Sequence, residues 1–177
     1  MKRILIKSES PIFIGEYPFH KQLKDDLFPK LYNYKDALDK KTNVKATMTD
    51  WNWEKDNGKV QRLKNCIMEE LKSYFDFSAV NAPQPGLYCS TFWGNVYWKD
   101  DYTQPHHHIP WDLFSFAYFL NSKWYHPPLI FTQYGERIRS KEGTFVIFPS
   151  HLQHHVPKNR FKDPRMTLSG NFRLKQS

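Results

Sequence analysis

The sequence predicts a mainly β chain with flanking helices, an α+β organisation whose second half closes into a barrel or jelly roll. Two observations predict this class: a helical pattern confined to the first half, and a series of short aromatic and β-branched runs in the second half. With 177 residues, 40% of them hydrophobic, the chain can bury a sizeable core. Because no linker, repeat or low-complexity segment divides it, we expect one domain over 1–177, with its core at about 88–173 and supporting helices and strands at 1–87.

The supporting elements are expected in the first half. Residues 1–7 predict a first strand, and residues 43–53 predict a strand or an extended loop. A short helix should run from His20 to Phe28 and end near Pro29. A longer helix should follow Gly58 and cover one side of a sheet. Its apolar stripe recurs at steps of three or four residues and consists of Val60, Leu63, Ile67, Leu71 and Tyr74.

The second half predicts the β core. Its runs are rich in Phe, Tyr, Val, Ile, Thr and Trp, and glycines and prolines separate them. The expected strands are 87–98, 113–120, 128–133, 143–148, 152–156 and 165–173.

Composition narrows the class of protein. The 26 basic and 18 acidic residues give a net charge of +8, which suits an anionic partner such as nucleic acid, a membrane face or a small acid. Only two cysteines occur, so a disulfide-rich secreted scaffold is excluded. No apolar run is long enough for a secretory signal or a membrane span. We expect a cytoplasmic protein with reduced thiols and no membrane partner.

The histidines form a candidate metal site. Six of the eight lie in two clusters, at 106–108 and within 151–155. In an extended strand the side chains of His106 and His108 point to the same face, so both can reach one ion, and His154 is the leading third ligand. Three imidazoles would leave positions open for a chelating cosubstrate and oxygen. Clustered histidines also occur on solvated loops or satisfy hydrogen bonds in a core, so the clusters alone leave both interpretations open.

A candidate carboxylate site follows eleven residues after His154. Strand alternation places Arg165, Thr167 and Ser169 on one face. A guanidinium binds a carboxylate through two hydrogen bonds, and a nearby hydroxyl adds a third. An inward-facing arginine would need an anionic partner, whereas an exposed arginine on an edge strand would need none.

The order of these residues resembles the iron(II)/2-oxoglutarate-dependent dioxygenases, and especially their prolyl-hydroxylase-like members. Residues 97–106 are similar to the stretch that leads from a tyrosine to the first metal ligand in that family. Residues 148–157 (FPSHLQHHVP) resemble its distal-histidine strand, and residues 165–171 resemble its closing strand. The resemblance covers about 88–173 and implies a double-stranded β-helix, the jelly roll also found in cupins.

The resemblance implies an enzyme that decarboxylates 2-oxoglutarate to succinate and CO2 with O2 and hydroxylates an unactivated C–H bond. The implied Fe(II) ligands are His106, His108 and His154. The residues implied to bind the C5 carboxylate of 2-oxoglutarate are Tyr97, Arg165 and Thr167. A protein side chain is the favoured prime substrate, with nucleic acid or a small molecule as alternatives.

One departure from the family concerns the metal site. His108 stands where the family carries Asp or Glu, and Asp112 is a fallback carboxylate that we rank below it. Two other classes of protein stay open. One is a non-enzymatic cupin-like module that binds a metal, a protein or nucleic acid. The other is a cupin-type dioxygenase that uses three histidines without 2-oxoglutarate.

Overall fold

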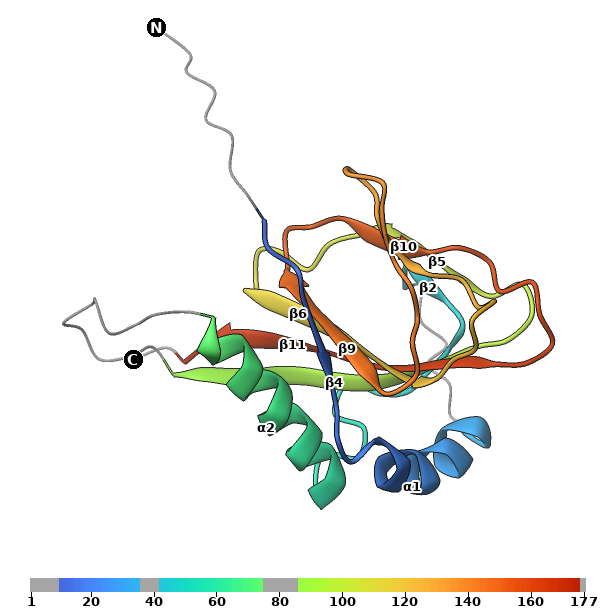
Figure 1. The fold of residues 1–177 in the computed structure, drawn as a ribbon, viewed down its shortest axis with the longest axis horizontal. Coiled ribbons are helices and arrows are strands. Elements are labelled where there is room, and N and C mark those ends of the chain that lie inside the picture. Colours follow the sequence, from blue (N-terminus) through green and yellow to red (C-terminus); the bar gives the residue numbers. More distant parts are fainter. Residues whose placement is uncertain (1–9, 36–41, 75–85, 176–177) are drawn as a thin grey trace, which may run out of the picture.

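The structure is a computed structural model that describes residues 10–35, 42–74 and 86–175 (Figure 1). Two antiparallel sheets form the body of the molecule. The larger sheet has the strand order β1 (Phe13–Glu16), β9 (Thr144–Pro149), β6 (Phe114–Asn121), β11 (Arg165–Leu174), β4 (Leu87–Tyr97) and β3 (Thr47–Met48). The smaller sheet has the order β2 (Val44–Lys45), β5 (Tyr102–His106), β10 (His154–Val156), β7 (Leu129–Phe131) and β8 (Glu136–Ile138).

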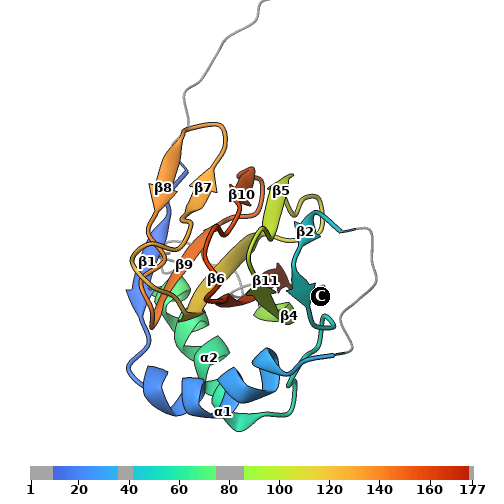
Figure 2. The same cartoon turned by 90° about the vertical axis from the view of Figure 1, so that its right-hand side faces the viewer.

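The sheets face one another and form the jelly roll that the sequence predicts (Figure 2). Alternating side chains from the two inner faces fill the space between them, as expected for stacked sheets. This inner core consists of Tyr97, Phe119, Leu129, Phe131, Val146, Phe148, Leu152 and Val156. All six expected strands are present, each within a few residues of its expected bounds. Strands β1, β5 and β8 were not expected, because their residues carry mixed polar and apolar side chains.

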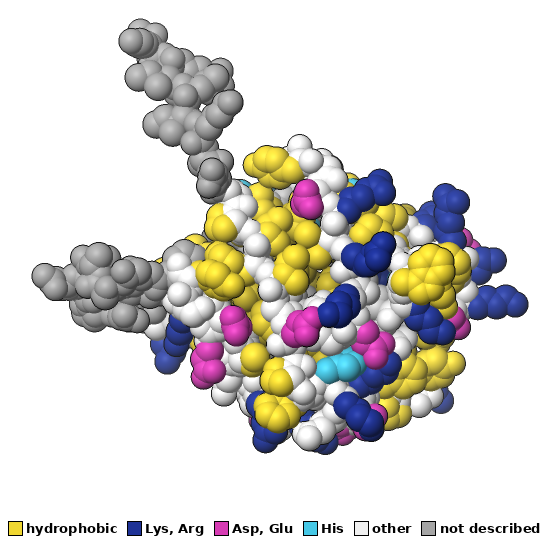
Figure 3. All heavy atoms as spheres, in the orientation of Figure 1, with side chains coloured by type: hydrophobic (Ala, Val, Ile, Leu, Met, Phe, Trp, Pro, Cys, Tyr) yellow, Lys and Arg dark blue, Asp and Glu magenta, His cyan; other side chains and the backbone are white. Residues whose placement is uncertain are grey.

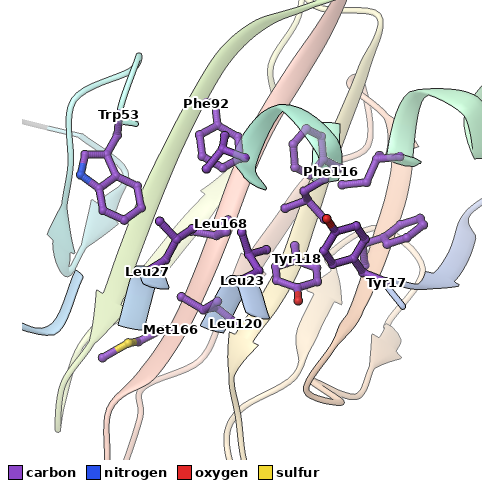
Figure 4. Packing of buried hydrophobic residues seen from close by; sticks show 14 of the residues in the cluster. Tyr17, Leu23, Leu27, Trp53, Phe92, Phe116, Tyr118, Leu120, Met166 and Leu168 are labelled. Carbon is purple, nitrogen blue, oxygen red and sulfur yellow. The ribbon is translucent and has the colours of Figure 1, made fainter. Parts of the chain in front are cut away.

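Both helices, α1 (His20–Tyr32) and α2 (Gly58–Ser73), pack on the outer face of the larger sheet. Figure 4 shows Leu23 and Leu27 of α1 lying against the strand residue Leu168. The longer helix covers a sheet face as predicted, and it begins after Asn57, whose side chain accepts the backbone N–H of Lys59 at 2.9 Å. Its buried stripe is Val60, Leu63, Ile67 and Leu71.

Two boundary predictions for these helices were wrong. Helix α1 continues through Pro29 to Tyr32. Its apolar stripe explains this, because burial of Leu31 contributes about 1.5–3 kcal/mol and offsets much of the ~3 kcal/mol cost of an interior proline. Tyr74 lies outside the buried stripe of α2, since it is the residue after the helix and is 56% exposed.

The expected strand at 1–7 lies outside the described residues. None of the helices in the described ranges has the length and apolar composition needed to cross a membrane.

Candidate active site

A cavity lies between the two sheets and receives side chains from both. Strands β4, β6 and β11 form one wall, and β5, β7 and β10 form the other. The polar residues that line it are Asn95, Tyr97, Thr103, His106, His108, Ser115, His154, Arg165, Thr167, Ser169 and Asn171. The six residues expected to hold the metal and the C5 carboxylate are among them. The cavity therefore brings together both candidate sites, which the chain keeps far apart in sequence.

The histidine end of the cavity is made by His106, His108 and His154. The register of β5 and β10 pairs His154 directly with His106, so both imidazoles leave the sheet on the same face. The loop after β5 carries His108, whose backbone N–H donates to the carbonyl of Ser150 at 2.9 Å. One ring nitrogen of each histidine lies within 4.8 Å of those of the other two. This spacing allows all three to bind one ion.

Hydrogen bonds fix the orientation of two of the rings. Nδ1 of His106 donates to the carbonyl of Gln104 at 2.8 Å, and Nδ1 of His154 donates to the carbonyl of Leu152 at 2.9 Å. A carbonyl only accepts, so these nitrogens carry the protons and Nε2 of each ring holds a lone pair. This second hydrogen bond is the usual support of a metal-binding histidine.

Burial keeps these histidines neutral. It lowers the pKa of His108 to about 3 and the pKa of His154 well below its ordinary value. Each ring also disfavours a positive charge on its neighbours. Three neutral imidazoles in a half-open cleft suit a divalent first-row metal such as Fe(II), because metal binding requires deprotonated ligands.

Asp112, the fallback ligand, is occupied elsewhere. Its carboxylate accepts Nε of Arg173 at 2.7 Å and the hydroxyl of Ser90 at 3.1 Å. It lines a separate surface groove with Trp111, outside the cavity. Of the two candidates, His108 is the one that lies with the other histidines.

The arginine end of the cavity contains a buried charge. Arg165 is 1% exposed, and its Nε and Nη2 donate to the hydroxyl of Ser140 at 3.1 Å. Its Nη1 is buried without a hydrogen-bond partner, and no acidic side chain in the described ranges pairs with it. Burial lowers the pKa of Arg165 to about 10, so the guanidinium stays charged at neutral pH. A buried charge of this kind is costly unless an anion joins it.

Neighbouring side chains surround this guanidinium. The register of β4 and β11 pairs Arg165 with Tyr97 and Thr167 with Asn95. The guanidinium carbon lies 5.1 Å from the centre of the Tyr97 ring. Burial raises the pKa of Tyr97, so its hydroxyl, which lies 2.8 Å from the hydroxyl of Thr103, stays protonated. Ser169 lines the same cavity, as strand alternation predicts for the face it shares with Arg165.

Sequence reasoning missed two residues of the site, Ser140 and Trp93. Ser140 holds Arg165 from 25 positions away, and no local signal indicates it. Asn95 and Trp93 both line the cavity. Oδ1 of Asn95 and Nε1 of Trp93 are buried and have no hydrogen-bond partner. Alternation with Tyr97 already places Asn95 on the cavity face. That its Oδ1 lacks a hydrogen-bond partner follows only from the tertiary structure.

Solved structures share this fold. A Pseudomonas putida prolyl-4-hydroxylase matches with a TM-score of 0.70 and 13% identity over 93% of each chain. A viral collagen prolyl hydroxylase from Paramecium bursaria Chlorella virus-1, in complex with 2OG, matches with a TM-score of 0.67 and 13% identity over 93% of this chain and 96% of that one. HygX from Streptomyces hygroscopicus, with nickel and 2-oxoglutarate bound, matches with a TM-score of 0.66 and 8% identity over 92% and 82%.

No protein-family model matches the chain, and no curated protein matches it by sequence. The structural matches show that the fold is that of the 2OG-Fe(II) oxygenases, and they confirm the expected double-stranded β-helix. At 8–13% identity the likeness defines the fold alone.

Proposed function

We propose that the protein is an Fe(II)- and 2-oxoglutarate-dependent dioxygenase that hydroxylates an unactivated C–H bond. One observation carries this proposal: a buried, unpaired Arg165 shares a cavity with three neutral histidines. A dicarboxylate that reaches from the guanidinium to a metal ion would satisfy both ends. A cupin-type dioxygenase that works without 2-oxoglutarate would not require a buried arginine in the cavity. A non-enzymatic binding module would not need to consume the dicarboxylate.

His106, His108 and His154 would hold the iron. The bound metal would supply the redox chemistry by which O2 and 2-oxoglutarate yield succinate, CO2 and a hydroxylated product. His106 and His154 orient their lone pairs through the backbone carbonyls that their Nδ1 atoms contact. The aromatic wall around His154, where Phe148 lies 4.7 Å away between ring centroids, would limit the access of water to a metal held there.

Arg165, Thr167 and Tyr97 would bind the C5 carboxylate of 2-oxoglutarate. The free Nη1 of Arg165 and the protonated hydroxyl of Tyr97 supply donors in a site that excludes solvent. Charge-assisted hydrogen bonds of this kind are roughly twice as strong as neutral ones.

The prime substrate in this proposal is a protein side chain, supported by the likeness in fold to two prolyl hydroxylases. We place the activity in the cytoplasm, in keeping with the free thiols of Cys66 and Cys89. We also propose that residues 1–177 form a single oxygenase domain.

The test is anaerobic titration with Fe(II) and then 2-oxoglutarate, followed by visible absorption and by assay of succinate once O2 is admitted. We expect a weak charge-transfer band that Arg165→Ala removes. Arg137→Ala, an exposed arginine on β8, is the matched control and should keep the band. Iron binding without any response to 2-oxoglutarate would contradict the proposal and favour a cupin-like module.

A further inference from the structure

Three loops meet at the arginine end of the sheets and form a surface outside the cavity. They are residues 98–101, 122–128 and 157–164, which we call the loop surface. Trp124 is 80% exposed on it, and Phe161 is 41% exposed. The ring of Tyr125 connects them, since its centroid lies 5.5 Å from that of Trp124 and 4.4 Å from that of Phe161. Large aromatic rings are thus presented to solvent side by side.

Basic side chains surround these rings. Figure 3 shows Lys and Arg gathered around hydrophobic side chains at the right-hand end of the molecule, where these loops lie in Figure 1. The Asp163 carboxylate neutralises Lys123 at 3.0 Å, and the Asp101 carboxylate accepts the backbone N–H of Trp98. Within the described part of the chain, four exposed cations of the loop surface make no ion pair: Lys99, Lys158, Arg160 and Lys162.

Hydrogen bonds hold the loops in place. The side chain of Asn159 is buried and donates to the carbonyls of Tyr97 at 2.9 Å and Asp163 at 3.0 Å. Asn121, the last residue of β6 before the second loop, donates to the carbonyl of Pro164 in the third loop at 2.8 Å. The backbone of the loops that carry the rings and cations is therefore ordered before any partner arrives, which lowers the entropy cost of binding.

We propose that the loop surface binds single-stranded nucleic acid, with bases stacked on Trp124 and Phe161 and phosphates contacted by the four free cations. Exposed ring faces next to unpaired cations are the combination that single-stranded nucleic acid requires. A duplex keeps its bases stacked on each other and offers no ring face to Trp124.

A second exposed tryptophan shows the contrast. Trp111 is 74% exposed, yet the arginine in its groove, Arg173, is already paired with Asp112. That groove therefore presents an aromatic ring but no unpaired cation to contact a phosphate.

The test is fluorescence anisotropy with a labelled single-stranded oligonucleotide of about 12 nucleotides, at about 50 mM and about 200 mM salt. We expect Trp124→Ala to raise the Kd at least about fivefold. The double variant Arg160→Glu, Lys162→Glu should also weaken binding and flatten its dependence on salt. The matched controls are Trp111→Ala and the double variant Lys55→Glu, Lys72→Glu, which reverses two exposed cations elsewhere.

Several results would overturn the proposal. An unchanged Kd for Trp124→Ala would do so, as would equal losses in the controls or equal affinity for a duplex. Trp124-dependent binding to phosphatidylserine vesicles without oligonucleotide binding would assign the surface to membranes instead. The 2-oxoglutarate titration of Trp124→Ala should match wild type, because the loop surface lies outside the cavity. A negative result for oligonucleotide binding therefore does not contradict the proposed oxygenase function.

Discussion

The two ends of the cavity differ in charge and are built from different strands. One end holds neutral imidazoles and the other holds a charged guanidinium. The histidine end is made by short strands of the smaller sheet and the loop that carries His108. The arginine end is made by β4 and β11, the two longest strands, paired over ten positions. Burial makes the first end neutral by lowering the pKa of its imidazoles, whereas Arg165 stays charged at the second.

This difference follows from the ordinary pKa of each group. An imidazole titrates near neutrality, so desolvation readily removes its proton and leaves a metal ligand. A guanidinium titrates far above neutrality, so the same desolvation leaves a charge that needs an anion. The comparison predicts that a substitution at the histidine end abolishes metal binding. A substitution at the arginine end should weaken the binding of the dicarboxylate and leave metal binding unchanged.

The largest effect is expected for His154→Ala. This variant should lose stoichiometric Fe(II) or Co(II) binding, because it removes the buried imidazole that we propose as a ligand opposite His106. Equilibrium dialysis under anaerobic conditions measures it. His155→Ala is the matched control, since the neighbouring ring bonds Thr132 instead of joining the cluster. Retained stoichiometric metal in His154→Ala would place the third ligand elsewhere.

A smaller effect is expected for Arg165→Met. Loss of one partner of a buried charged pair costs about 3–5 kcal/mol, so 2-oxoglutarate should bind about 100-fold more weakly or worse. Metal binding should persist. The free protein should be as stable as wild type or more stable, because a buried unpaired charge is removed. Calorimetry and thermal unfolding measure the two quantities. Simultaneous loss of metal would mean that the ends are not independent.

The smallest effect is expected for Tyr97→Phe. It removes one hydroxyl from the arginine end while the ring stays in the core, so 2-oxoglutarate affinity should fall about fivefold, or roughly 1 kcal/mol. Tyr118→Phe is the control, since it removes a buried hydroxyl that contacts His20 on the outer side of the larger sheet. Equal losses in both variants would assign the effect to general destabilisation.

The sequence by itself determined the class of fold and the six residues expected to hold the metal and the dicarboxylate, all of which line the cavity. Alternation along β11 already places Arg165 and Thr167 on one face, and the helical period gives the buried stripe of α2. These are local patterns with a fixed period, so a single chain segment reveals them. The roles of these residues and the single domain over 1–177 stay predictions.

Tertiary structure alone decided which polar groups meet. His154 lies opposite His106 through a register between β5 and β10, and Ser140 supports Arg165 from a distant loop. Asp112 is removed from the site by its pairing with Arg173. Each of these contacts joins residues far apart in sequence, where periodicity gives no information. Burial, which sets the pKa values and leaves Nη1 of Arg165 without a partner, likewise exists only once the two sheets have closed around the cavity.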